Sequence, residues 1–379
     1  MKNPAKDTKF DFLLVGHFGY YNIGDDLIGV SIIKDIMQKY PLAEIVLTVG
    51  KKYHLNCNSF LKRPLHQSNF SPLSISRLIN RSDKFIIAGG THFHDTGNAH
   101  LRYIKIFLFF LFISAYGSIL GKPPILLGHG IGPISRIWNI FFTRIIFRFS
   151  SLIVVRDRDS FETVRGLGFE YKCIQKFDLT APLLYDLYSR RKDILKTYTL
   201  AISLAPVYSI FYNDIIRDKL FIKEFSVALR DILNVYPTLN IKLFGFWSGN
   251  EYSESDWIED LSDSLKDYGQ LKAIFYDGNI GYFLNELQCC FAFVGMQYHG
   301  ALISYLLGLP IIIIPYQEKC KSLAREIMLD DSAVLELDNL NSELIFKKIN
   351  DLLSNSSKYM PKRSPKNMVD LSKESFDYI

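Results

Sequence analysis

The order of apolar segments is the feature that most constrains the fold of this chain. Short β-branched runs of strand length alternate with runs whose apolar residues repeat at helical spacing, in two successive blocks. This alternation predicts parallel sheets covered by helices, because a parallel connection needs a crossover segment that packs on the sheet. The expected strands are 11–16, 44–49, 84–88, 124–128, 152–155, 200–204, 240–244, 272–276, 290–294 and 310–314.

The two blocks predict two domains. A chain of 379 residues exceeds what one hydrophobic core usually holds. We therefore expect an α/β protein with two Rossmann-like domains that face each other across a cleft. Residues 1–188 would form the first domain, and residues 189–379 the second, with a helix in the C-terminal tail. The charged segment 186–198 is typical of a linker or a crossing helix.

Composition excludes several classes of protein. The net charge of +5 comes from scattered lysines and arginines, so no nucleic-acid-binding surface is expected. The five cysteines show no CxxC spacing, which argues against a disulfide framework or a structural zinc site. The polar start of the chain is not expected to be a signal peptide, and a reducing cytoplasm is the expected compartment.

One strongly apolar run, 104–120, needs an assignment of its own. Lys105, Ser114 and Gly117 interrupt it, and it is shorter than the roughly 20 residues that a membrane span needs. A buried helix is therefore expected. The alternative is that this run and the basic, aromatic segment 137–149 form a surface that contacts the inner face of a membrane peripherally.

Polar side chains follow the first and third predicted strands. Asn22, Asp25 and Asp26 stand where a helix begins, and paired aspartates would repel a phosphate there, so we expect them to bind sugar hydroxyls. The alternative for Asp25 is a helix cap. Thr91, His94 and Asp95 follow the third strand and are expected to bind the same acceptor. A metal site built from His92, His94 and His100 is the alternative, but their spacing gives it little support, and no metal is expected.

The fourth and fifth strands lead into anion-binding chemistry. Gly130 and Gly132 lie in GHGIGP, a turn whose backbone N–H groups suit a phosphate or carboxylate. Arg156, at the end of the fifth strand, would bind the same anion through its guanidinium. In the alternative interpretation, the polar residues around Arg156 are helix caps.

In the second block, GMQYHGALISYLLGLPIIIIPYQEKC predicts a strand-helix-strand unit from Gly295 to Cys320. His299 falls at the helix start and Lys319 just after the second strand, so both are expected at the carboxyl edge of one sheet. The alternatives are a histidine packed at a helix start and a lysine in a solvated turn.

These segments, in order, resemble the polysaccharide pyruvyl transferase family. The motifs are NIGDD (22–26), AGGT (88–91), GIGP (130–133), VRDRDS (155–160), FDLTAP (177–182) and the 299–319 segment. The resemblance implies a fold like that of GT-B glycosyltransferases and transfer of the enolpyruvyl group of phosphoenolpyruvate onto two sugar hydroxyls as a cyclic ketal. It implies no cofactor beyond phosphoenolpyruvate as co-substrate.

The resemblance also assigns roles to residues. His299 would be the catalytic acid and base, and Arg156 and Lys319 would hold the donor's carboxylate and phosphate. Gly130, Gly132, Gln297 and Tyr298 would complete the donor site. The acceptor, a glycan or lipid-linked glycan for capsule or exopolysaccharide, would contact Asn22, Asp25, Asp26, Thr91, His94 and Asp95.

Two departures from the family pattern leave alternatives open. The family commonly has GxRLH where this chain has Gly295-Met296-Gln297-Tyr298-His299, and Thr91 replaces the third glycine of a GGG triplet. A glycosyltransferase with a nucleotide-sugar donor is one alternative function. A non-catalytic glycan-binding subunit is another.

Overall fold

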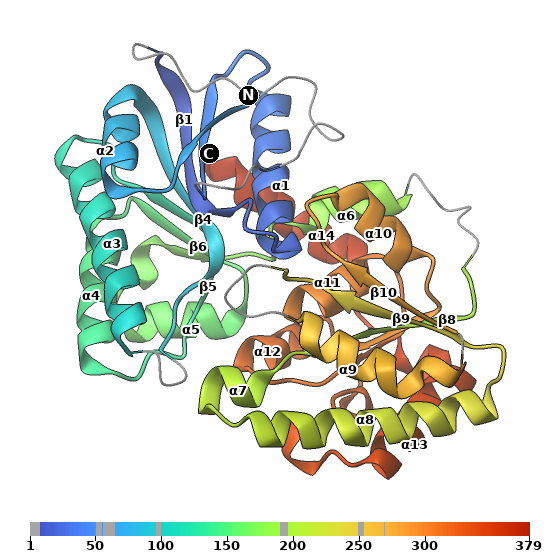
Figure 1. Ribbon diagram of the computed structural model, residues 1–379. Coiled ribbons are helices and arrows are strands. Elements are labelled where there is room, and N and C mark those ends of the chain that lie inside the picture. The colour runs from blue at the N-terminus through green and yellow to red at the C-terminus, as the bar shows by residue number, and fades with distance from the viewer. Residues whose placement is uncertain are drawn as a thin grey trace. The chain divides into compact units, whose positions relative to one another are not determined.

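The computed structural model describes residues 8–50, 55, 65–95, 100–189, 196–248, 254–268 and 270–379. Their contacts divide them into two compact units. The N-terminal unit holds the described residues up to Tyr20, those from Gly24 to Leu183, and Val369–Ile379. The C-terminal unit holds Tyr21–Ile23 and Leu184–Met368. Each unit has its own parallel sheet with helices on both faces (Figure 1), so the predicted class of two Rossmann-like α/β domains is confirmed.

The sheet of the N-terminal unit has the order β3-β2-β1-β4-β5-β6-β7 in the described residues. Its central strands are buried along most of their length, as parallel strands covered on both faces must be. The strand order reverses between β1 and β4, the kind of point beyond which open α/β sheets bind ligands. The strands are β1 (Phe10–Phe18), β2 (Ile45–Val49), β3 (His66–Asn69), β4 (Ser82–Phe93), β5 (Ile125–Ile131), β6 (Leu152–Val155) and β7 (Cys173–Gln175).

The helices of this unit lie on the two faces of the sheet, with α2, α3 and α4 on one face and α1 on the other (Figure 1). Phe107, Phe110 and Ile113 of α3 pack into the sheet core, while Leu108, Phe112 and Ile119 are exposed, so the helix expected to be buried is buried on one side only. No helix in the described part of the chain is long and apolar enough to cross a bilayer. The helices are α1 (Ile23–Lys39), α2 (Pro72–Arg81), α3 (His100–Ile119), α4 (Ile137–Phe149), α5 (Arg158–Gly166) and α6 (Ala181–Ser189), whose later part belongs to the other unit.

The C-terminal unit has the strand order β10-β9-β8-β11-β12 in the described residues. The strands are β8 (Thr199–Ser203), β9 (Asn240–Gly245), β10 (Leu271–Phe275), β11 (Ala292–Gly295) and β12 (Ile311–Ile313). The helices are α7 (Val207–Tyr212), α8 (Ile215–Val235), α9 (Ser255–Leu265), α10 (Ile280–Gln288), α11 (Tyr298–Leu306), α12 (Glu318–Glu326) and α13 (Ser342–Ser354). In this unit α8 and α13 pack together on one face of the sheet, and α10 lies on the other (Figure 1).

The tail of the chain corrects the expected domain limits. Val369–Ile379, assigned from sequence to the second domain, belongs to the N-terminal unit. Part of helix α14 (Pro365–Lys373) and the turn after it bind there, because Ser372 Oγ donates to Asp178 O at 2.8 Å and Lys39 Nζ donates to Phe376 O at 2.6 Å. Residues 190–195 of the expected linker lie outside the described residues.

Candidate functional site

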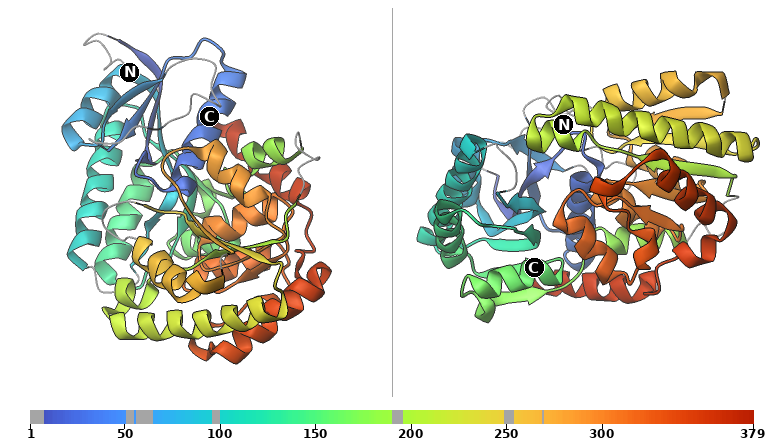
Figure 2. Two further views of the ribbon diagram at one scale, coloured as in Figure 1. Left: turned by 45° about the vertical axis from the view of Figure 1, so that its right-hand side comes forward. Right: turned by 90° about the horizontal axis from the view of Figure 1, so that it is seen from below.

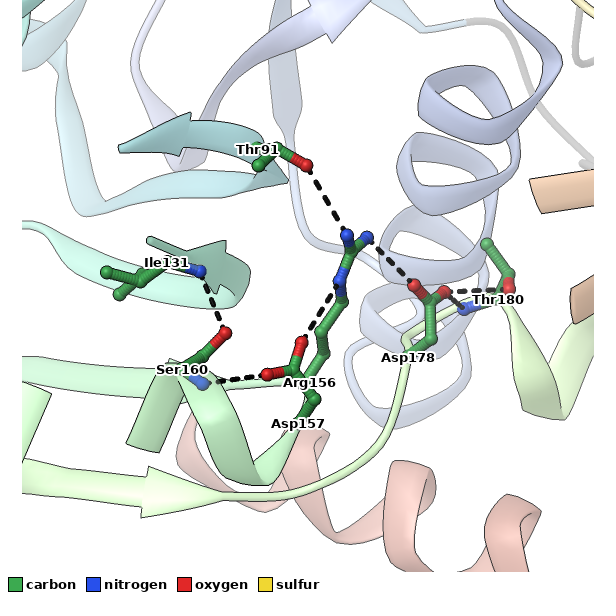
Figure 3. Close-up of polar contacts among 7 residues, drawn as sticks. All are labelled: Thr91, Ile131, Arg156, Asp157, Ser160, Asp178 and Thr180. Atoms are coloured by element: carbon green, nitrogen blue, oxygen red, sulfur yellow. Dashed lines mark hydrogen bonds and ion pairs between the residues drawn. The ribbon is translucent and has the colours of Figure 1, made fainter. Parts of the chain in front are cut away.

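Arg156 is the centre of a buried polar network at the carboxyl end of the N-terminal sheet (Figure 3). It follows β6, and its side chain is 1% exposed. Nη1 donates to Asp178 Oδ2 at 3.3 Å, Nη2 donates to Thr91 Oγ1 at 3.4 Å, and Nε lies 3.7 Å from Asp157 Oδ2. Two carboxylates therefore offset the charge of one buried guanidinium, as burial of a charge requires.

Backbone features hold both carboxylates in place (Figure 3). Asp157 caps α5 by accepting from Ser160 N at 2.8 Å, and Asp178 Oδ1 accepts from the backbone N–H of Thr180 at 3.1 Å and from its hydroxyl at 2.8 Å. Burial raises the pKa of Asp157, although the Arg156 charge opposes this shift. Gly130 makes room for the guanidinium, since a Cβ there would lie 2.8 Å from Arg156 Nη2.

This network changes what the glycine-rich turn can do. The N–H of Ile131 donates to Ser160 Oγ at 2.8 Å, and the N–H of Gly132 donates to Phe93 O at 2.7 Å. The backbone donors expected to bind an anion at Gly132 are thus used within the fold. The turn also ends four residues before α4 begins at Ile137, so it does not form a helix N-terminus.

Arg156 is likewise engaged by protein groups in this structure. Its binding of a donor anion stays a prediction, and the structure adds that such an anion would have to compete with Asp157 and Asp178. The polar environment of Arg156 includes the helix cap that the alternative interpretation anticipated, formed by Asp157.

A second polar group lies where β1 and β4 end, at the point where the strand order reverses. His17 Nδ1 lies 3.2 Å from Asp25 Oδ2, and the His17 ring stacks on Tyr20 with centroids 4.0 Å apart. Gly90 has φ +114°, and a Cβ there would lie 2.8 Å from His92 Cε1 and 3.5 Å from Asp25 Oδ1. Asp25, predicted to contact the acceptor, is thus grouped with two histidines that sequence reasoning did not assign to the site.

These histidines differ in what they can offer a ligand. Burial lowers the pKa of His92 to about 4, although the nearby Asp25 carboxylate acts to raise it. Burial also lowers the pKa of the neighbouring His129 to about 3. Both rings are therefore neutral at pH 7. His129 Nε2 donates to Ile87 O at 3.0 Å, which fixes its tautomer, and His92 Nδ1 has no hydrogen-bond partner among the described residues. A neutral imidazole beside a carboxylate suits a neutral polyol better than an anion.

Two other residues predicted to bind the sugar acceptor, Asp26 and Asp95, form hydrogen bonds within the fold. Asp26 is 2% exposed and accepts from Gly19 N at 2.6 Å, which closes the loop after β1. Asp95 accepts from Ser135 N at 2.9 Å, Arg136 N at 2.7 Å and Asn139 Nδ2 at 3.0 Å. Burial alone would raise the pKa of Asp95, but these bonds lower it overall. Its carboxylate is hydrogen-bonded at the start of α4, and its contact with a sugar stays a prediction.

Asn22 belongs to a different unit from the aspartates that follow it in the chain. Asn22 forms an antiparallel bridge with Trp247, and Ile23 N donates to Phe246 O at 3.2 Å, so this segment belongs to the C-terminal unit. Thr91 remains at the N-terminal sheet edge, bonded to Arg156. His94 follows β4 there and is partly buried. No group of three or more metal-ligating side chains occurs in the residues that the structure describes, which do not include the His100 side chain.

In the C-terminal unit, His299 and Lys319 occupy equivalent positions. His299 lies in the first turn of α11, after β11, and Lys319 in the first turn of α12, after β12. These strands are paired and parallel, so both helices begin at the same edge of the sheet. Cys320 Sγ donates to Met296 O at 3.5 Å and ties the two helix starts together. The topology therefore places His299 and Lys319 at the same edge of the sheet, which is where the sequence predicted them.

Neighbouring aromatic rings define the surroundings of both side chains. The His299 ring meets the buried Tyr298 ring edge-on at 5.1 Å, and Lys319 Nζ lies 5.5 Å from the centroid of Tyr316. Lys319 and the backbone N–H groups at the two helix N-termini supply positive charge at this edge, while Glu318 beside Lys319 pairs with Arg325 at 2.8 Å. Such an edge suits an anionic ligand.

Gln297, the departure from the family pattern, has a partner that sequence reasoning missed. Its amide donates to Glu254 Oε1, and Glu254 Oε2 accepts from Phe246 N at 2.7 Å. Glu254 is 3% exposed, and burial raises its pKa to about 8 in spite of these hydrogen bonds. Glu254 lies 43 positions before Gln297, after an undescribed segment, and no local signal marks it. A neutral glutamine matches a carboxyl group that is mostly protonated at pH 7.

Comparison with known proteins agrees with this architecture. In its UDP co-structure, S. aureus MnaA aligns with a TM-score of 0.63 at 10% identity, over 97% of this chain and 97% of that chain. UDP-GlcNAc 2-epimerase from Neisseria meningitidis bound to UDP-GlcNAc aligns with a TM-score of 0.61 at 11% identity, over 97% and 99%. Anabaena Alr3699/HepE in complex with UDP-glucose gives 0.58 at 12%, over 98% and 100%. At these identities the likeness shows the fold alone, which is of the GT-B type.

The family follows from the sequence match. No curated protein matches the chain. A model of the polysaccharide pyruvyl transferase family matches residues 22–318, which is most of the chain and includes His299, Arg156 and Gln297. The chain therefore belongs to the polysaccharide pyruvyl transferase family.

Proposed function

We propose that this protein transfers the enolpyruvyl group of phosphoenolpyruvate onto a sugar diol as a cyclic ketal, in the cytoplasm, during surface polysaccharide synthesis. The observation that carries the proposal is the placement of His299 and Lys319 in the first turns of α11 and α12, at one edge of the same sheet. Phosphoenolpyruvate carries a carboxylate and a phosphate, the groups that such an edge binds.

The reaction needs one acid and base beside the bound donor. A proton adds to the methylene carbon of phosphoenolpyruvate, and a sugar hydroxyl attacks the adjacent carbon. The bond from that carbon to the phosphate oxygen breaks, and a second hydroxyl attack closes the ketal. The two hydroxyls lose two protons, of which one balances the new methyl group and one leaves with the phosphate. We assign the proton transfers to His299 and the anion contacts to Lys319, with Gln297 and Tyr298 beside them.

The acceptor contacts are proposed for the sheet edge of the N-terminal unit. Asp25, His92 and Thr91 supply hydroxyl-binding groups there without a surplus of positive charge. Arg156 orients Thr91 and Asp178 through its buried hydrogen bonds. The acceptor is a glycan or a lipid-linked glycan, the substrate class that the family implies.

The test is release of inorganic phosphate from phosphoenolpyruvate in the presence of candidate glycan acceptors. His299→Ala should lower the turnover number by about 10²-fold or more, because general acid–base catalysis typically contributes that much. His66→Ala is the matched control, since His66 is another partly exposed histidine, on β3. Full activity of the His299→Ala protein would contradict the assignment of His299.

A nucleotide-sugar glycosyltransferase is the second candidate function. What favours it is the set of structures with the same fold, which include complexes with UDP, UDP-GlcNAc and UDP-glucose. Thermal unfolding with phosphoenolpyruvate or UDP, each alone, separates the candidates. Stabilisation by phosphoenolpyruvate that is lost in Lys319→Ala supports the pyruvyl transferase. Stabilisation by UDP alone, with sugar transfer from a UDP-sugar, supports the glycosyltransferase. Glycan binding without turnover on either donor would instead indicate a non-catalytic subunit.

A further inference from the structure

Helices α3 and α4 carry large apolar side chains on the side that faces away from the sheet. On α3 these are Leu108, Phe112 and Ile119, which are 46%, 46% and 80% exposed. On α4 they are Ile137 and Phe141, which are 83% and 58% exposed. Within each helix the spacings are four or seven residues, so each set forms one stripe. We call the two stripes together the α3–α4 face.

The two helices that carry these stripes pack side by side. Phe107 of α3 meets Trp138 of α4 with ring centroids 6.1 Å apart, and both views of Figure 2 show the helices next to each other along one side of the unit. The opposite sides of both helices are also apolar and pack into the sheet core, through Phe110 and Phe147 among others. Single exposed apolar residues are ordinary, but a contiguous patch on helices that are apolar on two sides marks a contact surface.

Positive charge accompanies this patch. Lys105 lies three residues before Leu108, and Arg144 and Arg148 continue the α4 stripe after Phe141. All three side chains are exposed. The sequences of α3 and α4 contain four lysines and arginines and no aspartate or glutamate. An exposed apolar patch flanked by long cationic side chains suits an interface that is apolar inside and anionic at its surface.

The charges on the α3–α4 face favour one kind of binding partner over two others. A second copy of the chain docked on the same patch would bring Lys105, Arg144 and Arg148 against their own equivalents, and like charges repel. A nucleic acid would use the cations but not Ile119 and Ile137. A bilayer containing anionic lipids uses both kinds of side chain.

We propose that the α3–α4 face docks this protein peripherally on the surface of a bilayer that contains anionic lipids. The isoleucine, leucine and phenylalanine side chains enter the boundary between headgroups and acyl chains, and the cations bind lipid phosphates. The proposal does not depend on the reaction assigned above.

The test is sedimentation of the purified full-length protein with vesicles. Binding is expected with phosphatidylcholine mixed with phosphatidylglycerol, and much less binding with phosphatidylcholine alone. It should fall when salt is raised from about 0.1 M to about 1 M, because lipid headgroup charges are screened. Arg144→Glu with Arg148→Glu should weaken binding by more than about tenfold, and Ile137→Ser with Phe141→Ser should weaken it without removing charge.

A control pair lies on α8 in the other unit. Ile216→Ser and Lys219→Glu alter an isoleucine that is 74% exposed and an exposed lysine on a helix that also carries acidic residues. These changes should leave vesicle binding unaltered. Unchanged thermal unfolding of all variants shows that the fold is intact, as expected for exposed positions.

Three results would overturn the proposal. One is absence of binding to anionic vesicles. Another is binding that the α3–α4 variants and the α8 variants reduce equally. The third is a different partner for the α3–α4 face in a protein that does not bind vesicles. That partner would be a second copy, if sedimentation velocity shows a dimer that Ile137→Ser with Phe141→Ser dissociates. It would be a nucleic acid, if Arg144→Glu with Arg148→Glu abolishes nucleic-acid binding.

Discussion

Arg156 is a fully buried charge, and its neighbours explain why the fold tolerates it. Asp157, Asp178 and Thr91 provide partners from three separate segments of the N-terminal unit. A buried ion pair contributes little by itself, but removal of one partner leaves an uncompensated charge in the interior. The sequence indicated a functional arginine here, while the partners from distant segments, above all Asp178, could be recognised only in three dimensions.

Replacement of this arginine should therefore destabilise the protein strongly. Arg156→Ala strands two carboxylates, and we expect it to lower the free energy of unfolding by roughly 3–5 kcal/mol. Arg158→Ala, an exposed position two residues later, should lower it by less than about 0.5 kcal/mol. Urea-induced unfolding of both variants measures the difference. Equal stability of the two would mean that the buried network is not formed.

At the scale of elements, the strands that sequence reasoning missed are the two edges of the N-terminal sheet. β3 (HQSN) has no apolar alternation, and β7 (CIQ) is three residues long, so neither has the pattern that identifies a strand. Short apolar runs of strand length identified every other described strand. Sequence thus located the elements that carry His299 and Lys319, because those follow strands with strong apolar patterns.

Glu254 shows what local patterns cannot reveal, because it joins the ends of two strands that are not neighbours. It binds Phe246 after β9 and Gln297 after β11, while β8 lies between these strands in the sheet. Only the completed sheet brings these groups together. The hydrogen bonds of Glu254 to Phe246 and Gln297 therefore form only when this edge of the sheet is assembled.

The raised pKa of Glu254 makes the stability of the fold depend on pH. In the folded protein the Glu254 carboxyl group has a pKa of about 8. In the unfolded chain its pKa is the ordinary 4.5, so between these pH values the folded protein keeps a proton that the unfolded chain has released. Stability from this group is complete below pH 4.5 and is lost as pH rises through 8. We expect wild type to lose about 2–3 kcal/mol more than Glu254→Gln between about pH 6 and pH 9.

Denaturant unfolding at the two pH values gives the change in the free energy of unfolding for wild type and for Glu254→Gln. The difference between these two changes isolates Glu254, because the contributions of the other titrating groups cancel. Glu286→Gln is a control, since burial would raise the pKa of Glu286 but its lysine partners, Lys242 and Lys272, lower it instead. A Glu254→Gln protein with the same pH dependence as wild type would show that Glu254 is ionised when folded.

At the scale of the whole molecule, residues 369–379 matter to a unit that begins more than 300 residues earlier. Ser372 binds Asp178 O, Lys176 pairs with Glu374, and Phe376 is 2% exposed. Sequence reasoning assigned this tail to the second domain because it follows that domain in the chain. Nothing in its composition indicates which core it joins.

Removal of the tail should therefore weaken the N-terminal unit selectively. In a protein lacking residues 369–379, amide hydrogen exchange should accelerate in α1 and around residues 176–183 and stay unchanged in β8 and β9. Mass spectrometry of exchanged peptides measures this. Faster exchange confined to the C-terminal unit would contradict the assignment of the tail.

The return of the tail also has a consequence for biosynthesis. The ribosome makes a chain from its N-terminus, and domains usually fold as they emerge in that order. Here the segments that complete the N-terminal unit, residues 369–379, are translated after the entire C-terminal unit. The unit that is synthesised first therefore gains its last packing segment only after the C-terminal unit has been made.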